Sequence, residues 1–583
     1  MLRIGLIIDG DSLRWFDAEL VRRIGPERIT LVIQQELPRR SLPERIQRAL
    51  RRGTLLGSLV FRAAVWLERR TPALRRPEIE DLFQSIALDK VCDAERLRVR
   101  PIVSRSGFVH RFADEDVQAI KACKLDVILR MGSGILRGEI LSAAMHGILS
   151  FHHGDNRTHR GGPAGFWEVL ERRDCTGFIV QRLTEALDAG EVLARGELGT
   201  KRRYLLNQHH LVKCSLQTML DVLARLEREG AHPREAPAVD WYAPPVYSVP
   251  RVADTLRYLG AQLRRALAGL VRRLLVQRNA WELRVFQGDW RRLVAARARA
   301  LPVPRGKFWA DPFIVRRAGA NVIFFEEYEF ARGKAHIAAL VGTGEGGFSY
   351  AGPVLRTPYH LSFPFVFEYQ GQLYMCPETH AARRIELWRC VSWPLEWCFE
   401  KVLMDGVCAC DSMLAERGGR WWLLTNLERD GAGDLCRELH VFHADSPLAE
   451  RWTPLEANPV VTGASRARNA GLLQRDGKLY RLAQAQGFDR YGRALGLYEV
   501  THLSPEGYAE HPVAVLEPHR GLGAVGIHHL SACEGLVVFD ALRPRWLWTA
   551  GVRAVQPWKS VRIPVPGARG PGREARRATE GQS

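Results

Sequence analysis

Long apolar runs are missing from this sequence, and their absence limits the classes of protein that it can encode. No stretch of about eighteen apolar residues occurs in the 583 residues, so the sequence predicts no membrane-spanning helix. The apolar run at Met1–Asp9 is too short for a signal peptide and reaches an acid too soon. We therefore expect it to form a first buried strand.

Paired cysteine motifs are missing as well. The eleven cysteines are scattered without repeated Cys-x-x-Cys spacing, which argues against a zinc site. Reduced thiols and a cytoplasmic location are the simplest account.

Acidic residues are fewer than basic ones, 65 against 84, which gives a formal net charge of +19. This excess suits phosphorylated sugars, folate carboxylates, nucleic acid or an anionic membrane, and a solvated arginine-rich surface explains it equally well.

The pattern of apolar residues divides the chain into four parts. Residues 1–230 alternate short β-branched strands with amphipathic helices, which predicts an α/β domain with a doubly wound parallel sheet. Residues 231–300 hold a proline-rich linker and a basic amphipathic helix. Residues 301–560 read as all β, and residues 561–583 as a disordered tail rich in Gly, Arg and Glu.

The basic helix, at 252–277, allows two interpretations. Its apolar residues repeat at helical spacing and its arginines cover much of the remaining surface. Such a helix can lie on an anionic membrane, which would make the protein peripheral to the inner membrane. It can also pack its apolar stripe on a neighbouring domain, which is the commoner arrangement.

A strand–glycine–strand unit recurs through residues 301–560. The units open at positions 311, 363, 411, 469 and 527, and in each a glycine suited to a hairpin turn follows eight residues later. A unit repeated about every fifty residues is typical of β-propellers, so we predict five four-stranded blades. Strand openings and the ends of second strands would meet at one mouth, lined by Asp311, Asp411, Glu327, Glu378, Asn469 and His528.

A series of short motifs lies between positions 131 and 190. The chain reads Met-Gly-Ser-Gly-Ile-Leu at 131–136, Ser-Phe-His at 150–152, Arg-Gly at 160–161 and Asp-Ala-Gly at 188–190. This order resembles the folate-dependent formyltransferases, such as those that act on methionyl-tRNA, glycinamide ribonucleotide and sugar nucleotides. Their core motif runs Asn-x-His, a Pro-containing loop, Arg-Gly and Asp-x-Gly.

The resemblance implies a Rossmann-like fold and 10-formyltetrahydrofolate as co-substrate. It assigns catalysis to His152 and Asp188, with Ser150 standing where the family has Asn. A serine has one donor hydrogen and reaches the oxyanion only from closer range, and His153 or Asn156 could compensate. The family's folate pocket corresponds to Met131, Gly132, Gly134, Ile135 and Leu136. A competing interpretation makes a metal site of His146, His152, His153, Asp155 and His159, although nothing in their spacing fixes a ligand geometry.

The repeat region resembles five-bladed propellers of the arabinanase and fructosidase type. It is still more similar to the module beside the glycosyltransferase domain of glucosamine inositolphosphorylceramide transferases. The hydrolases' acid in the fourth blade is replaced by Arg468-Asn469, which argues against glycoside hydrolysis, although Glu378 could substitute. A sugar-binding or structural propeller is the better interpretation.

Together these features predict N-formylation of an amino sugar, nucleotide- or lipid-linked. A catalytically silent carbohydrate-binding or scaffold protein is an alternative, because Ser150 replaces the family's Asn. A methionyl-tRNA formyltransferase-like enzyme is another, supported only by the basic charge. We do not expect nucleic acid as the partner, because no small OB-like barrel follows the first domain.

Overall fold

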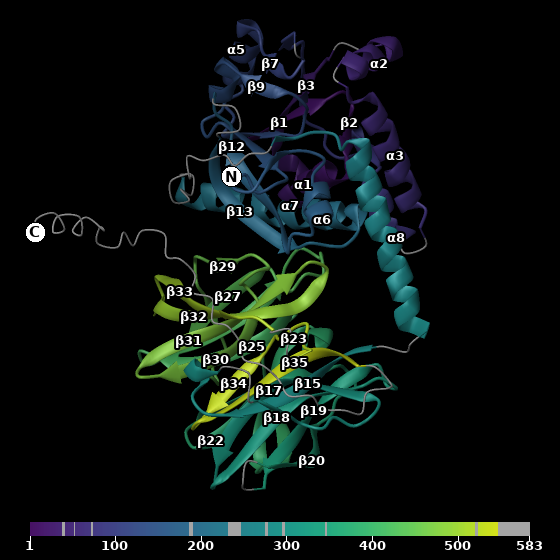
Figure 1. The fold of residues 1–583 in the computed structure, drawn as a ribbon. Coiled ribbons are helices and arrows are strands. Elements are labelled where there is room, and N and C mark those ends of the chain that lie inside the picture. The colour runs from purple at the N-terminus through teal and green to yellow at the C-terminus, as the bar shows by residue number, and fades with distance from the viewer. Residues whose placement is uncertain are drawn as a thin grey trace, which may run out of the picture.

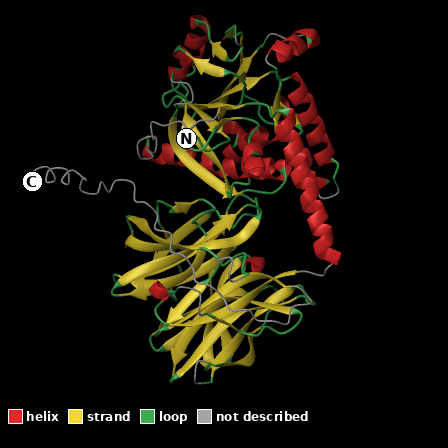
Figure 2. Ribbon diagram, in the orientation of Figure 1, coloured by secondary structure: helices red, strands yellow, loops and turns green. Residues whose placement is uncertain are grey.

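The chain forms two parts in a computed structural model that describes residues 1–37, 41–51, 53–71, 74–105, 107–185, 190–230, 246–274, 278–293, 298–343, 347–518 and 523–545. The N-terminal part combines strands and helices, and the second part consists almost entirely of strands (Figures 1 and 2). Asp188, the proline-rich linker at 231–245 and the predicted tail at 561–583 lie outside the described residues. No described helix is both long and apolar enough to cross a membrane.

A seven-stranded sheet forms the centre of the N-terminal part. Its order is β13 (Glu191–Gly199), β12 (Cys175–Arg182), β10 (Ile148–His152), β8 (Val127–Arg130), β1 (Ile4–Asp9), β3 (Ile29–Gln35) and β5 (Glu95–Val99). The five strands from β10 to β5 run parallel, whereas β12 pairs antiparallel with both of its neighbours, β10 and β13. The strand–helix alternation of the sequence therefore gives a mainly parallel sheet with an antiparallel edge.

Helices cover both faces of this sheet because successive strand residues point to opposite sides. On one face, Leu6 and Ile8 pack in a core with α1 (Trp15–Ile24) and α7 (Tyr204–Glu229). On the other face, Ile7 packs in a core with α5 (Asp114–Ala122). The remaining helices are α2 (Leu42–Arg51), α3 (Leu55–Arg69), α4 (Pro77–Asp81), α6 (Phe166–Glu171) and α8 (Val252–Leu274).

Five antiparallel sheets make up the described residues of the second part, four with four strands and one with five. The first contains β17 (Lys307–Arg317), β18 (Ala320–Glu329), β19 (Lys334–Gly342) and β20 (Phe348–Leu355), and the second β21 (Ser362–Tyr369), β22 (Gln372–Glu378), β23 (Arg384–Ser392) and β24 (Glu396–Asp405). The third contains β25 (Cys408–Arg417), β26 (Arg420–Glu428), β27 (Glu438–Ala444) and β28 (Thr453–Pro454), with β29 (Val461–Thr462) also paired to β27. The fourth contains β30 (Asn469–Arg475), β31 (Lys478–Gly487), β32 (Arg490–Ser504) and β33 (Gly507–Leu516).

The fifth sheet joins strands from both ends of this part. Its order is β16 (Arg299–Ala300), β15 (Arg278–Gln287), β35 (Leu536–Arg545) and β34 (Leu530–Cys533). β15 lies in the stretch that the sequence assigns to the linker and basic helix, so the structure places the start of the strand-rich part earlier than position 301. The first strands of the repeats, β17, β21, β25, β30 and β34, contact one another in that order, and β34 also contacts β17.

The hairpin glycines found in the sequence occupy the expected turns. Gly319, Gly371, Gly419, Gly477 and Gly535 all have a φ between 72° and 79°. The residue before each of them also has a positive φ, as a two-residue type I′ turn requires. These local turns explain why the repeat is legible in the sequence.

Candidate functional sites

The edge where the parallel strands end brings His152 and Ser150 together. β10 ends at His152 and pairs in parallel with β8, which ends at Arg130. Ser150 and His152 are two residues apart on a strand, so their side chains lie on the same face of the sheet. Ligands in open α/β sheets bind beyond this carboxyl edge. Asp188 cannot be placed here, because it lies outside the described residues.

Arg130 is the residue of this edge that the sequence interpretation missed. Its Nη1 donates to Ser150 Oγ at 3.4 Å and its Nη2 to the carbonyl of Gly134. Its Nε is buried without an acceptor, and no ion pair joins the guanidinium to a carboxylate among the described residues. Burial lowers the pKa of Arg130, against the favourable charge of Asp9. A charged residue at the end of an otherwise buried strand was the signal available in the sequence.

The two residues expected to compensate for Ser150 are engaged elsewhere. His153 Nε2 lies 3.1 Å from Ser215 Oγ on α7, and burial lowers the pKa of His153 to about 3. Asn156 Oδ1 accepts a hydrogen bond of 2.7 Å from Arg195. Arg130, rather than either of these residues, therefore supplies donors beside Ser150.

The competing metal interpretation gains no support from the geometry. His159 is buried against Glu168, at 3.1 Å, and Asp155 pairs with Arg157. Four groups of described His, Cys, Asp and Glu residues bring three ligand atoms within 4.8 Å of one another, and none of these groups contains His146, His152, His153, Asp155 or His159.

The loop expected to line a folate pocket is held by buried polar side chains. Asp9 accepts a hydrogen bond of 2.7 Å from the backbone N–H of Ser133, and a Cβ on Gly132 would approach the Asp9 carboxylate to 2.7 Å. Gly134 has a φ of 84° and its missing side chain would overlap the ring of His110. The side chains of Met131 and Leu136 are buried in core clusters, and Ile135 opens β9 (Ile135–Arg137). This segment therefore presents mainly backbone at the sheet edge.

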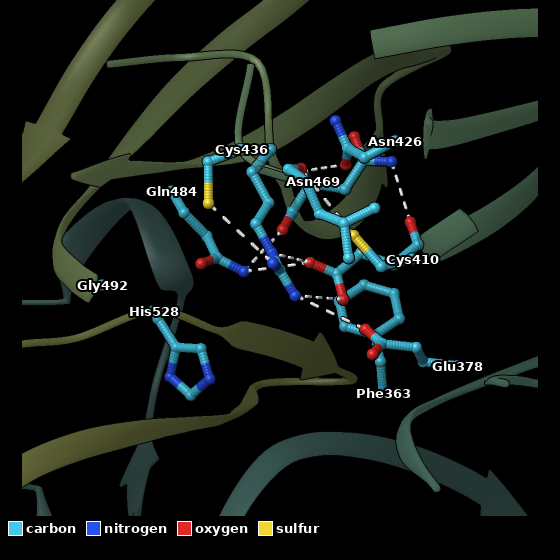
Figure 3. A network of polar contacts seen from close by, with 12 residues as sticks. Phe363, Glu378, Cys410, Asn426, Cys436, Asn469, Gln484, Gly492 and His528 are labelled. Carbon is cyan, nitrogen blue, oxygen red and sulfur yellow. Dashed lines mark hydrogen bonds and ion pairs between the residues drawn. The ribbon is translucent and has the colours of Figure 1, made fainter. Parts of the chain in front are cut away.

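A second cluster lies at the predicted mouth, where the first strands of the repeats begin. From here on, the mouth means the residues that the structure brings together there, which are Asp311, Glu326, Glu378, Asp411, Arg468 and His528. Arg468 Nε donates to Asp411 Oδ2 at 2.6 Å, and its Nη2 lies 3.4 Å from Glu378 Oε2. Figure 3 shows the network of polar contacts around this pair, with Glu378, Asn469 and His528 labelled. Burial and the charge of Glu378 hold the pKa of Asp411 well above its usual value, in spite of Arg468. Glu378 itself, bonded to His380, has its pKa lowered to about 2 against the effect of burial. The pKa values of the two carboxyls are thus shifted in opposite directions.

Asn469 and His528 hold the mouth together from the fourth and fifth sheets. Asn469 Nδ2 donates to the carbonyl of Asp411 at 2.8 Å. His528 lies between Asp311, at 3.1 Å, and Asp540, at 2.8 Å. Burial alone would lower the pKa of His528, but the charges of Asp540 and Asp311 raise it to about 10. The imidazolium therefore stabilises two buried carboxylates.

Glu327, expected at the mouth, belongs to a different cluster. Its carboxylate is fully buried and accepts hydrogen bonds from Lys307 at 2.7 Å, Trp309 at 2.9 Å and Tyr350 at 2.9 Å. Its neighbour Glu326 faces the mouth instead. Burial and the charges of Asp311 and Glu378 raise the pKa of Glu326 well above its usual value.

The cause of this difference is the register of the hairpin. Glu378 pairs with Ser362, the residue before the second opening, and the equivalent residue of the first hairpin is Glu326, which pairs with Ala310. Glu327 is one residue further along β18, and neighbouring strand residues point to opposite sides.

A cavity of about 380 Å³ lies between the two parts, next to Arg468. Thr200 and Lys201 line it from the N-terminal part, and Cys436, Arg468 and Tyr491 from the strand-rich part. The Arg468 guanidinium lies 5.0 Å from the centre of the Tyr491 ring. The N-terminal part thus forms one wall of the approach to the mouth.

Charged contacts hold the two parts together around this cavity. His210 Nε2 lies 2.7 Å from Asp434 Oδ2, and both side chains are largely buried. Arg429 makes a two-pronged ion pair with Asp221, at 2.8 and 3.0 Å. Separating the two parts would leave the buried Asp434 carboxylate without its hydrogen bond to His210, which costs free energy.

Comparison with known proteins divides the chain in the same way. A family model described as glucosamine inositolphosphorylceramide transferase 1, N-terminal, matches residues 294–530. The relative of that name in Oryza sativa subsp. japonica is 34% identical over 235 residues, which are 39% of this chain and 31% of the relative. That in Arabidopsis thaliana is 33% identical over 207 residues, 35% of this chain and 27% of the relative. The chain spans about a third of the length of these relatives.

A methionyl-tRNA formyltransferase from Rickettsia prowazekii is 29% identical over 96 residues, 16% of this chain and 32% of the relative. Among solved structures, an α-L-arabinofuranosidase from Coprinopsis cinerea is 14% identical, with a TM-score of 0.32 over 48% of this chain and 96% of that one. A glycinamide ribonucleotide transformylase from Symbiobacterium toebii is 17% identical, with a TM-score of 0.25 over 40% and 89%. The match of residues 294–530 to the family model shows that the strand-rich part is similar to the N-terminal module of the inositolphosphorylceramide transferases.

Proposed function

We propose that this protein is an N-formyltransferase that moves a formyl group from 10-formyltetrahydrofolate to the amino group of an amino sugar. The observation that carries the proposal is the grouping of His152, Ser150 and Arg130 at the carboxyl edge of a parallel sheet. The similarity to a methionyl-tRNA formyltransferase over 96 residues supports the same chemistry.

Formyl transfer requires donors aimed at an oxyanion and a group that moves a proton. The acceptor nitrogen attacks the formyl carbon, and the bond from that carbon to N10 of the folate breaks as N10 takes a proton. Protonated His152 is assigned to the oxyanion and to the proton delivered to N10. The family resemblance assigns the proton of the attacking amine to Asp188.

Arg130 is assigned the oxyanion contact that the family's Asn would make. Its guanidinium lies beside Ser150 and makes no ion pair with a carboxylate among the described residues, although the charge of Asp9 acts on it from further away. A negative charge that develops beside Ser150 would therefore meet a cation with donors to offer. Such a charge-assisted hydrogen bond is roughly twice as strong as a neutral one. The residues present therefore fit a formyl donor in spite of the Asn-to-Ser change.

An amino sugar is the proposed acceptor because of the strand-rich part. We infer that its five sheets are the blades of a propeller, since their first strands contact one another in a ring. Carboxylates and an amide at the mouth suit sugar hydroxyls as hydrogen-bond partners. The relatives are named for glucosamine and a ceramide lipid, which supports a lipid- or nucleotide-linked amino sugar.

The test is formyl transfer from 10-formyltetrahydrofolate to a panel of glucosamine-containing nucleotides and lipids, followed by mass spectrometry. His152→Ala should abolish the formylated product. His146→Ala is the matched control, because His146 precedes the same strand at the opposite edge of the sheet, and it should retain activity. Formylation of methionyl-tRNA alone would favour the tRNA alternative, and no formylation of any acceptor would overturn the proposal.

Carbohydrate binding without catalysis is the second candidate, favoured by the ion pairs at Arg468. These pairs occupy both Asp411 and Glu378, which disfavours glycoside cleavage and leaves a polar surface for sugar binding. Glycan binding that survives in the Asp311→Ala, Asp411→Ala double variant would exclude the mouth as its site. Release of reducing sugar by the wild type, lost in that variant, would instead show hydrolysis.

A further inference from the structure

α3 and α8 lie against each other along one flank of the N-terminal part (Figure 1). Tyr258 of α8 is buried and donates to Glu68 of α3 at 2.7 Å. Gly57 of α3 packs against the backbone of Pro250, where a Cβ would come within 2.7 Å of the carbonyl oxygen. These contacts fix one side of each helix to the protein. We call the opposite side of each helix its outer side.

The outer side of α8 is apolar. Leu256, Leu263, Leu267 and Leu270 are each more than half exposed. At 100° per residue these positions fall within one narrow stripe of the helix. The stripe that the sequence shows is therefore not the surface that packs on the protein, which is formed around Thr255 and Tyr258.

The outer side of α3 is apolar as well. Leu56, Leu59, Trp66 and Leu67 are more than half exposed, and at 100° per residue these positions fall within an arc of about 100° of the helix. The Arg70 guanidinium lies 4.0 Å from the centre of the Trp66 ring. Single exposed apolar side chains are ordinary, but eight on two helices that contact each other are more than isolated residues, and they indicate a partner.

Charge on these helices is almost entirely positive. α8 contains five arginines and a single acid, Asp254. α3 contains Arg62 and Arg69 with one acid, Glu68, which is buried. Leucine and tryptophan flanked by arginine, in a helix too polar to span a bilayer, is the composition of helices that lie in a membrane interface.

We propose that the outer sides of α3 and α8 dock on the surface of an anionic lipid bilayer. The exposed leucines and Trp66 would enter the boundary between headgroups and acyl chains, and Arg257 and Arg264 would meet lipid phosphates. The charge decides between a bilayer and a second copy of this chain, because a second copy would bring the same arginines face to face. Docking places the protein at the surface where a lipid-linked acceptor would be found, but it does not depend on formyl transfer.

The test is co-sedimentation of the full chain with vesicles of phosphatidylcholine alone and of phosphatidylcholine with phosphatidylserine. We expect binding to the anionic vesicles that weakens with salt. Arg257→Gln and Arg264→Gln should each weaken it roughly fivefold, since an arginine near an anionic surface contributes about 1 kcal/mol. Leu263→Glu with Leu267→Glu should reduce it by at least about a hundredfold, because two buried leucines are lost.

Matched controls are Val391→Glu and Phe399→Glu, which alter exposed apolar residues of the strand-rich part and should leave vesicle binding unchanged. Circular dichroism checks that the α8 variant keeps its helix. Equal binding by the wild type and the Leu263→Glu, Leu267→Glu variant would overturn the proposal. Two other results, each without vesicle binding, would also overturn it. One is a dimer of the wild type that the Leu263→Glu, Leu267→Glu variant dissociates, and the other is binding of the wild type to RNA.

Discussion

Replacing Arg130 with methionine should separate catalysis from stability. The guanidinium makes two hydrogen bonds, to Ser150 Oγ and to the Gly134 carbonyl, each worth about 1 kcal/mol. Burying a cation without an ion-pair partner costs on the order of several kcal/mol, which methionine does not incur. These contributions oppose each other, so we expect the free energy of unfolding to stay within about 1 kcal/mol of the wild type or to rise. The rate of formyl transfer should fall about a hundred- to a thousandfold, as for the loss of one oxyanion donor.

Arg481→Met is the matched control, because Arg481 is a buried arginine with a partner. Both Nε and Nη2 donate to the Glu510 carboxylate at 2.8 Å, and the side chain is fully buried. Its removal should destabilise the protein by about 3–5 kcal/mol, since Glu510 is left uncompensated. Scanning calorimetry of both variants and steady-state kinetics of Arg130→Met make the comparison. If Arg130→Met unfolds as easily as Arg481→Met, or keeps full activity, its guanidinium is a structural group and the oxyanion assignment is wrong.

Three further predictions concern single residues. Ser150→Asn should keep the fold and retain or raise turnover, because the Asn amide restores beside Arg130 the donor that the folate-dependent formyltransferases have there. A fall in the rate of formyl transfer of more than about a hundredfold would show that the site is rebuilt around serine. The folded-state pKa of His528, about 10, lies above the 6.5 that is usual for a histidine. Its stabilisation is therefore complete below about pH 6.5 and declines by about 1.4 kcal/mol per unit as pH rises toward 10. Urea unfolding of His528→Gln should lack this slope. Glu326→Gln should destabilise the protein less in thermal unfolding than Glu327→Gln. Burial and the charges of Asp311 and Glu378 raise the pKa of Glu326 well above its usual value, so a neutral amide is tolerated there, whereas Glu327→Gln should cost about 1–3 kcal/mol by leaving buried donors incompletely paired. Equal shifts would contradict the assignment of the two carboxyls.

The repeat of the second part could be predicted because its signal is local. Each hairpin needs two residues with positive φ at its turn, and a glycine at 319, 371, 419, 477 or 535 marks that turn in the sequence. The fifth sheet could not be predicted in the same way. Its strand β15 precedes all the repeats and pairs with β35 from the far end of the chain, and no local pattern records such a partner.

The two candidate sites show the same limit. The sequence pattern located His152 and Ser150 at a strand end, but the contact of Ser150 with Arg130 depends on which strands lie side by side. Arg468 was recognised as a departure from a hydrolase pattern, whereas its pairing with both Asp411 and Glu378 required coordinates. Contacts between neighbouring strands are where single-sequence reasoning loses information, because strand order is a property of the whole fold.

The backbone at the mouth adds an independent reason to place function there. Asp311, Phe363 and Asp411 have φ values of 48°, 46° and 48°, each within the bulge that opens its sheet. A left-handed conformation costs a residue other than glycine on the order of 1 kcal/mol, and the fourth sheet uses Gly471 close to its opening. Glycine would relieve the strain at the other three openings if turning the chain were the only requirement. At two of these three openings the residue is an aspartate whose carboxyl group contacts His528 or Arg468, so the strain there coincides with a polar side chain. At the third opening, Phe363 packs in a core cluster instead.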